Sequence, residues 1–121
     1  MGVKRSIFGS FSFAFEGIKE ALKEEPNFRI HIIIGLTVSI LAFFLNFSNV
    51  EWLILIFKIL FVLILELVNT AIEGTVNLAS PEISREAKVA KDVMAAAVLL
   101  GAVLSVLVGL FLFLPKLTAF I

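Results

Sequence analysis

The chain lacks cysteine and tyrosine, and among its 121 residues there is one histidine and few charged side chains. Without cysteine it can form neither disulfides nor thiolate metal sites, and a single histidine, His31, cannot build a histidine metal cluster within one chain. Charged residues make up 17% of the sequence and sum to a net charge of zero. Because no basic stripe is present, we predict no nucleic-acid partner.

Several catalytic and nucleotide-binding motifs are absent as well. The sequence contains no phosphate-binding loop of the form GxxxxGK(S/T), and no GxGxxG, HExxH or GxSxG. If the chain handles ATP, a metal ion and scattered polar side chains must therefore do the work.

Apolar side chains are what the sequence has in abundance. They make up 60% of the residues, compared with about 45–50% in soluble domains, and the mean hydropathy is +1.10. A soluble domain of this length could not bury so much apolar surface. We therefore predict one integral membrane domain, residues 1–121, of the all-α class.

Four helices are predicted. Residues 29–47, 52–77 and 87–114 are each apolar and close to or above the roughly 20 residues that span a bilayer, although 52–77 must bury a polar face. Residues 7–24 place phenylalanine, isoleucine and leucine on one face at three- and four-residue steps, which predicts an amphipathic helix on the membrane surface. The sequence Ser80-Pro81-Glu82 resembles a helix start, and Pro115 is expected to stop the last helix.

The basic residues predict the orientation. They gather before the first span and between the second and third, so these segments, with the N-terminus, are expected to be cytoplasmic. The basic residues concerned are Lys4, Arg5, Lys19, Lys23, Arg29, Arg85, Lys88 and Lys91. Lys58, inside the second span, is expected to extend toward the outer face.

A polar face interrupts the second span. Glu66, Asn69, Thr70, Glu73 and Asn77 follow steps of three and four residues and therefore share one side of the helix. Burying a carboxylate in hydrocarbon costs roughly 2.5–3.5 kcal/mol, so intramembrane carboxylates usually mark functional sites. The alternative is that these side chains are neutral and hydrogen-bond neighbouring helices as a structural element.

The two glutamates are expected to have different roles. They lie seven residues apart, about 10 Å along the helix, which is too far to share one proton. Glu73 lies nearer the cytoplasmic end, where with Glu25 it could hold Mg²⁺ through oxygen ligands. Glu66 lies deeper, where it could act as a general base on a lipid hydroxyl.

Other charged residues near the same end allow two interpretations. Lys91 could neutralise a phosphate while Asp92 contacts another polar group, or the two could be an interfacial anchor pair. Glu24 and Glu25 could equally be a solvated helix end.

Two segments resemble a known family. ELVNTAIEGTVNL followed by AKVAKDVMAAAVLL resembles the signature of the prokaryotic diacylglycerol kinase family, and EEPNFRIH resembles its segment before the first span. The resemblance extends over essentially the whole chain. It implies a homotrimeric lipid kinase of the bacterial inner membrane, in which sites between subunits transfer the γ-phosphoryl group of ATP to a lipid alcohol with Mg²⁺.

The resemblance also implies roles for individual residues. Glu66 matches the general base, Glu25 and Glu73 match the metal ligands, and Asn69 matches the asparagine of the motif. The residues that match or lie near nucleotide contacts are Lys91, Asp92, Glu82, Ile83, Ser84, Arg5 and Phe13. The residues that would meet the substrate or organise the site are Arg29, His31, Thr70 and Asn77.

The chain departs from the family pattern at three positions. Asn77 stands where many members have aspartate, which removes one charge from the site. Phe13 stands where some members have tyrosine, and Arg5 is one position away from the family's N-terminal nucleotide-binding arginine. None of these changes removes the motif.

The family acts on more than one lipid. NFRIH with His31, EWLILIF and FLFLPKL resemble the branch that phosphorylates undecaprenol, and the alternative substrate is diacylglycerol. His31 could equally be an interfacial residue with no influence on selectivity. The non-enzymatic alternatives are an oligomeric proton or cation relay and a purely structural subunit.

Overall fold

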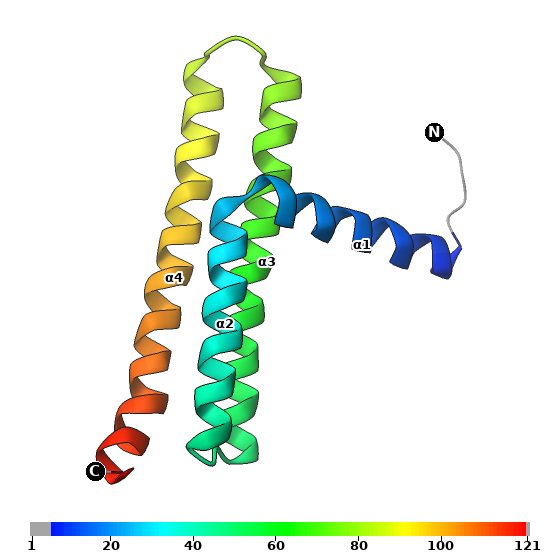
Figure 1. The fold of residues 1–121 in the computed structure, drawn as a ribbon. Helices are drawn as coiled ribbons and strands as arrows, with labels where there is room; N and C mark the ends of the chain where they lie inside the picture. Colours follow the sequence, from blue (N-terminus) through cyan, green and yellow to red (C-terminus); the bar gives the residue numbers. More distant parts are fainter. Residues whose placement is uncertain (1–5, 121) are drawn as a thin grey trace.

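The computed structural model describes residues 6–120, and these residues form helices with no strand among them. The helices are α1 (Ile7–Glu24), α2 (Pro26–Phe44), α3 (Asn49–Ala79) and α4 (Arg85–Phe120) (Figure 1). By length and composition, α2, α3 and α4 could each cross a membrane. The predicted all-α membrane class is therefore confirmed.

Helix α1 lies across the other helices. Ser6 caps its first turn, with the Ser6 Oγ accepting a hydrogen bond from the Gly9 N–H at 3.0 Å. The helix ends at Glu24, because Glu25 is extended before Pro26, as residues before proline tend to be. Figure 1 shows α1 leaving the bundle sideways, and its phenylalanine side chains are exposed to the surroundings. This arrangement suits a helix that lies on a membrane surface.

Both ends of α2 differ from the expected 29–47 segment. Pro26 occupies the first helical position, where its missing N–H costs nothing, so α2 begins earlier. It ends at Phe44, because Asn46 adopts a left-handed backbone conformation (φ 56°) that asparagine tolerates. Ser48 and Glu51 then form a reciprocal capping box that starts α3 before residue 52.

The turn between α3 and α4 differs from the prediction. Ser80 is the C-cap of α3 rather than the start of the next helix, and its N–H donates to the Val76 carbonyl at 2.8 Å. Helix α4 begins at Arg85, where Ser84 Oγ accepts from the Ala87 N–H at 3.1 Å. The prediction of a start at Ser80 was wrong because Ser84 provides the cap.

The expected stop at Pro115 was also wrong, because α4 continues through it to Phe120. A proline inside a helix removes one backbone hydrogen bond. Thr118 Oγ1 donates to the carbonyls of Leu114 and Pro115 at 3.0 and 3.1 Å, so this last part of the helix has additional polar contacts.

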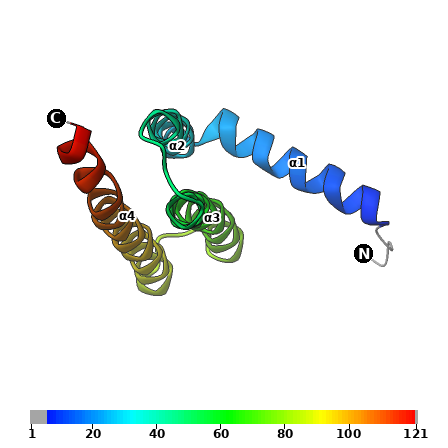
Figure 2. The same ribbon diagram turned by 90° about the horizontal axis from the view of Figure 1, so that it is seen from below.

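Helix α3 is the centre of the bundle. It contacts α1, α2 and α4, and in Figure 2 α2 lies above it and α4 to its left. The small residues Gly35 and Gly101 permit close approach, because a Cβ on Gly35 would lie 2.9 Å from Ile59 Cγ2 and one on Gly101 would overlap the Leu65 side chain. Most other large apolar side chains face outward, as expected for helices surrounded by lipid.

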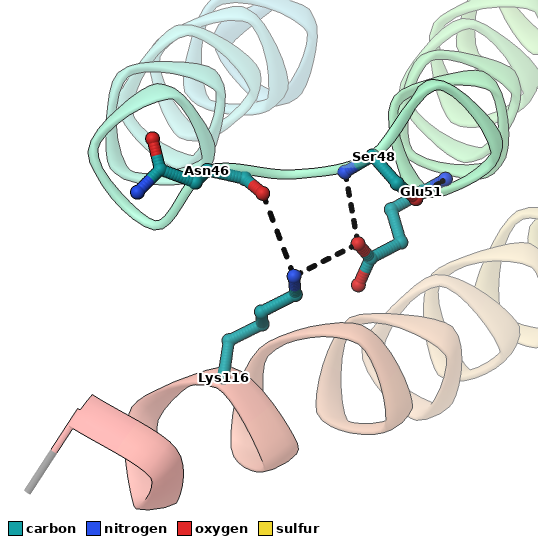
Figure 3. A network of polar contacts seen from close by, with 4 residues as sticks. All are labelled: Asn46, Ser48, Glu51 and Lys116. Atoms are coloured by element: carbon teal, nitrogen blue, oxygen red, sulfur yellow. Dashed lines mark hydrogen bonds and ion pairs between the residues drawn. The ribbon is translucent and has the colours of Figure 1, made fainter.

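The end of the bundle formed by the α2–α3 turn and the end of α4, here called the clasped end, is closed. A cluster of buried apolar residues fills it: Ala42, Leu45, Phe47, Leu55 and Leu112. In Figure 3, the Lys116 ammonium reaches from α4 to Glu51 Oε1 at 3.0 Å and to the Asn46 carbonyl at 3.5 Å. These contacts fix the α2–α3 turn to α4.

Lys58 does not extend to the outer face as expected. Its Nζ donates to Ser105 Oγ on α4 at 3.1 Å, and it lies 3.5 Å from the position that a Cβ on Gly109 would occupy. The Ser105 hydroxyl thus gives the ammonium a hydrogen-bond partner on the neighbouring helix.

Candidate functional site

The opposite part of the bundle, here called the open end, runs from α1 and the start of α2 to the α3–α4 turn, which projects beyond them (Figure 1). Glu66 lies on α3 below this end and is 4% exposed, the only buried charged side chain in residues 6–120. Its carboxylate faces α2, where His31 Nε2 lies 3.6 Å from Glu66 Oε1. The helical period of α3 aims this face inward, because Leu55, Val62 and Glu66 are its buried positions.

The next polar residues on α3 contact one another along the same face. Thr70 Oγ1 donates to the Glu66 carbonyl at 3.0 Å, and Asn69 Nδ2 donates to Glu73 Oε1 at 3.5 Å. The charges of Glu25 and Glu73 both act on the Glu66 carboxylate. Glu66, Asn69, Thr70 and Glu73 thus follow one another along one face of α3, and Glu25 lies where α1 meets α2.

A cleft of about 530 Å³ lies between α1 and α3 beside this region. Its walls are mostly apolar or small, with Thr70 on α3, and Glu20, Glu24 and Glu25 contribute from α1 and the residue after it. A cleft with an apolar floor and carboxylates nearby has room for a lipid chain and a polar group.

A second cavity, of about 230 Å³, lies at the α3–α4 turn. Six residues predicted from the sequence line it: Asn77, Glu82, Ile83, Ser84, Lys91 and Asp92. The Lys91 ammonium donates to Asn77 Oδ1 at 2.6 Å. Because this partner is neutral, Lys91 keeps an unpaired positive charge next to the cavity, suited to a phosphate.

Two polar residues that line this cavity, Lys88 and Ser80, were not among the site residues predicted from the sequence. Lys88 forms an ion pair with Asp92 at 2.6 Å, and Ser80 Oγ donates to the Glu82 carbonyl at 2.8 Å. The four-residue spacing of Lys88 and Asp92 is a recognisable helical ion-pair pattern. Ser80 could not have been found in this way, since its role depends on where α3 ends.

The carboxylates of Glu25 and Glu73 are hard oxygen ligands of the kind that Mg²⁺ prefers. Within residues 6–120 no three side chains of the ligating types come together. Two carboxylates still fit this ion, because Mg²⁺ sites in kinases commonly use one or two carboxylates together with water and substrate phosphates.

Two predicted residues, Arg29 and Phe13, line neither the cleft nor the cavity. The Arg29 guanidinium donates to the carbonyls of Leu22 and Lys23 at 2.9 and 3.0 Å, so it holds the end of α1 against α2. Phe13 lies on α1 and is 57% exposed, away from the residues that line the cavity at the α3–α4 turn. Arg5 lies outside the described residues.

Comparison with known proteins gives consistent matches. The family model described as prokaryotic diacylglycerol kinase matches residues 12–113. The chain is 44% identical over 111 residues to undecaprenol kinase of Bacillus subtilis strain 168, covering 92% of this chain and 90% of that protein. It is 40% identical over 116 residues to diacylglycerol kinase of Synechocystis, covering 95% and 66%. It is 35% identical over 100 residues to diacylglycerol kinase of Helicobacter pylori strain J99, covering 83% and 77%.

Proposed function

This chain belongs to the prokaryotic diacylglycerol kinase family, and we propose that it transfers the γ-phosphoryl group of ATP to undecaprenol. The family makes it a membrane lipid kinase, so the relay and the purely structural alternatives are set aside. The observation that carries the proposal is the buried carboxylate of Glu66 on α3. Other residues of α3 line both the apolar cleft and the cavity at the α3–α4 turn.

The cleft and the cavity suit the two proposed substrates, a lipid alcohol and ATP. The cleft between α1 and α3 is apolar and opens where a surface helix meets a spanning helix, which suits the hydroxyl end of a membrane lipid. The cavity at the α3–α4 turn is polar and has Lys91 beside it, which suits a nucleotide. Asn77 lies eleven residues after Glu66, about 16 Å along α3, with Glu73 between them. An extended nucleotide would direct its phosphates along this face toward Glu66.

In this mechanism Glu66 accepts the proton of the lipid hydroxyl while the oxygen attacks the γ-phosphorus and the bond to ADP breaks. Asn69 holds Glu73 through its amide, and Lys91 offsets negative charge on the phosphates. Glu25 and Glu73 would hold Mg²⁺, which when bound neutralises phosphate charge. Catalysis then depends mainly on positioning and electrostatics, as is usual for phosphoryl transfer.

We extend the proposal to the assembly and its orientation. The basic residues favour a cytoplasmic open end, where ATP is available. A homotrimer with sites between subunits, as the resemblance implies, would cover apolar side chains that one chain leaves exposed on its helices. It would also supply further groups around Glu25 and Glu73.

Undecaprenol is proposed over diacylglycerol because the Bacillus subtilis relative, matched over most of both chains, is an undecaprenol kinase. Diacylglycerol remains the second candidate, because the Synechocystis and Helicobacter relatives are diacylglycerol kinases.

The test is a side-by-side assay of the purified protein. Labelled γ-phosphoryl groups from ATP are followed into undecaprenol, diacylglycerol and a ceramide-like alcohol at equal mole fractions, with and without Mg²⁺. We expect the highest kcat/KM with undecaprenol and no transfer without the metal. A preference for diacylglycerol would replace the lipid assignment, and no transfer to any acceptor would contradict the proposed activity.

A further inference from the structure

The contact between α2 and α3 at Glu66 is unusual because it pairs a buried carboxylate with a basic side chain inside an otherwise apolar bundle. Glu66 is the one charged side chain that is buried in the described part of the chain, and its partner comes from a different helix. His31 Nε2 and Glu66 Oε1 are 3.6 Å apart, slightly beyond a hydrogen bond but within the range of an ion pair. A small movement of either side chain would bring the imidazole into hydrogen-bonding distance.

The other groups that act on Glu66 from α3 and from the α1–α2 junction do not hold its carboxylate. Glu25 and Glu73 carry the same charge as Glu66 and repel it. The Thr70 hydroxyl donates to the Glu66 backbone carbonyl, not to its side chain. A carboxylate surrounded in this way needs a donor from another helix to fix its orientation.

The nearby cations are occupied elsewhere. Arg29, two residues before His31 on α2, donates to carbonyls at the end of α1. Lys91 on α4 donates to Asn77, farther along α3. Within residues 6–120, His31 is therefore the only basic side chain in ion-pair range of the Glu66 carboxylate.

The exposure of the two side chains is unequal. The Glu66 side chain is 5% exposed and that of His31 is 26% exposed. The imidazole thus lies between the buried carboxylate and the surroundings of α2. A general base must be held in a fixed direction toward the hydroxyl that it deprotonates, and small displacements reduce the rate strongly.

We propose that His31 is a positioning residue, which holds the Glu66 carboxylate toward the lipid hydroxyl by a contact from α2 to α3. This inference rests on the proposed function, since it assigns His31 a role through the base of that reaction. It differs from a role in lipid selection, because the imidazole acts on Glu66 and not on the acceptor. The lipid preference should therefore stay the same when His31 is replaced.

The experiment is a double-mutant cycle on the purified protein, with labelled ATP, Mg²⁺ and undecaprenol or diacylglycerol as acceptor. His31→Ala should lower kcat on the order of 10–100-fold and leave the KM for the lipid and the ratio between the two acceptors unchanged. In a Glu66→Gln background, followed by long incubations, the same change should cause no further loss. His31→Gln, whose amide can still donate a hydrogen bond, should recover part of the rate.

Two controls separate this role from a structural one. Thr37→Ala, on the same helix, removes a hydroxyl that bonds only the Ile33 carbonyl and should leave kcat unchanged. If His31→Ala does not accumulate as folded protein, His31→Leu fills the volume without a donor and takes its place in the cycle. Equal losses in both backgrounds, a change confined to KM, or full activity of His31→Ala would each overturn the proposal.

The outcomes also separate this inference from the proposed function. If Glu66→Gln keeps the wild-type rate, the general-base assignment fails and the His31 role fails with it. If Glu66→Gln is inactive while His31→Ala is fully active, the proposed function stands and only the positioning role is lost.

Discussion

At the clasped end, apolar side chains and the contacts of Lys116 close the structure, whereas the open end has an apolar cleft and a cavity lined largely by polar residues. The clasped end joins three elements through a buried cluster. The open end contains the buried Glu66 and leaves Glu25, Lys91 and Asp92 accessible to ligands. The clasped end therefore maintains the packing, whereas the chemistry proposed above belongs to the open end, so we expect substitutions at the two ends to affect different measurements.

The largest expected effect is at the open end. Glu66→Gln removes the proposed base but keeps the shape of the side chain, so the rate of phosphoryl transfer should fall on the order of 100–10,000-fold. The thermal midpoint should not fall, because a buried charge is removed. Initial rates and thermal unfolding in the same detergent test this, and a rate close to wild type would contradict the assignment.

The next effect concerns the metal. Glu73→Ala removes one proposed ligand, so the Mg²⁺ concentration at half-maximal rate should rise by roughly 10-fold or more. A Mg²⁺ titration of the rate measures it. Thr75→Ala is the matched control, since its hydroxyl bonds only the Ala71 carbonyl of the same helix. An unchanged metal requirement in Glu73→Ala would exclude the ligand role.

Packing between α2 and α3 gives the third prediction. Gly35→Val places methyl groups against Ile59 and should destabilise the protein by about 1–3 kcal/mol. Gly74→Ala, where a Cβ meets no atom within 4 Å, should instead stabilise it slightly. Thermal unfolding of both variants provides the comparison, and equal stability would mean that the helices do not approach closely at Gly35.

The cavity at the α3–α4 turn should show a smaller effect. Lys91→Met removes a charge proposed to face phosphate and should raise the KM for ATP roughly 2–5-fold, in keeping with the low worth of exposed ion pairs. Lys88→Met, whose charge is already paired with Asp92, should change KM less. A larger effect of Lys88→Met would mean that Lys88, and not Lys91, faces the phosphate.

The smallest effect is expected at the clasped end. Lys116→Met keeps the apolar stem but removes the charge next to Glu51, so the protein should lose only a little stability and no activity. The difference from wild type should shrink at high salt, because salt screens this pair. A loss of activity without a loss of stability would show that the two ends are coupled.

The sequence was sufficient for the helices and for the polar face of α3, because both depend on local periodicity. It was not sufficient for the helix ends at Ser80 and Pro115. Either Ser80 or Ser84 could have capped the helix, and a helix can end at a proline or continue through it. The composition does not reveal which of these alternatives the chain adopts. Lys58 differed from expectation because its partner, Ser105, lies on another helix.

The same distinction applies to the site. Glu66, Glu73 and Asn77 could be found because they share one helical face, and Glu25 was added by its position and by the family resemblance. The contact of His31 with Glu66 and that of Lys91 with Asn77 join residues from different helices. Such pairs depend on how the helices pack, so a single sequence cannot specify them. The Mg²⁺, ATP and homotrimer assignments remain predictions.

The cleft lies between α3 and α1, the helix that leaves the bundle sideways in Figure 1. An acceptor that enters by this route never has to leave its own leaflet, so it meets the enzyme by two-dimensional diffusion. Its relevant concentration is then a surface density, and diluting the bilayer with inert lipid should slow turnover even when the amount of acceptor per millilitre is constant.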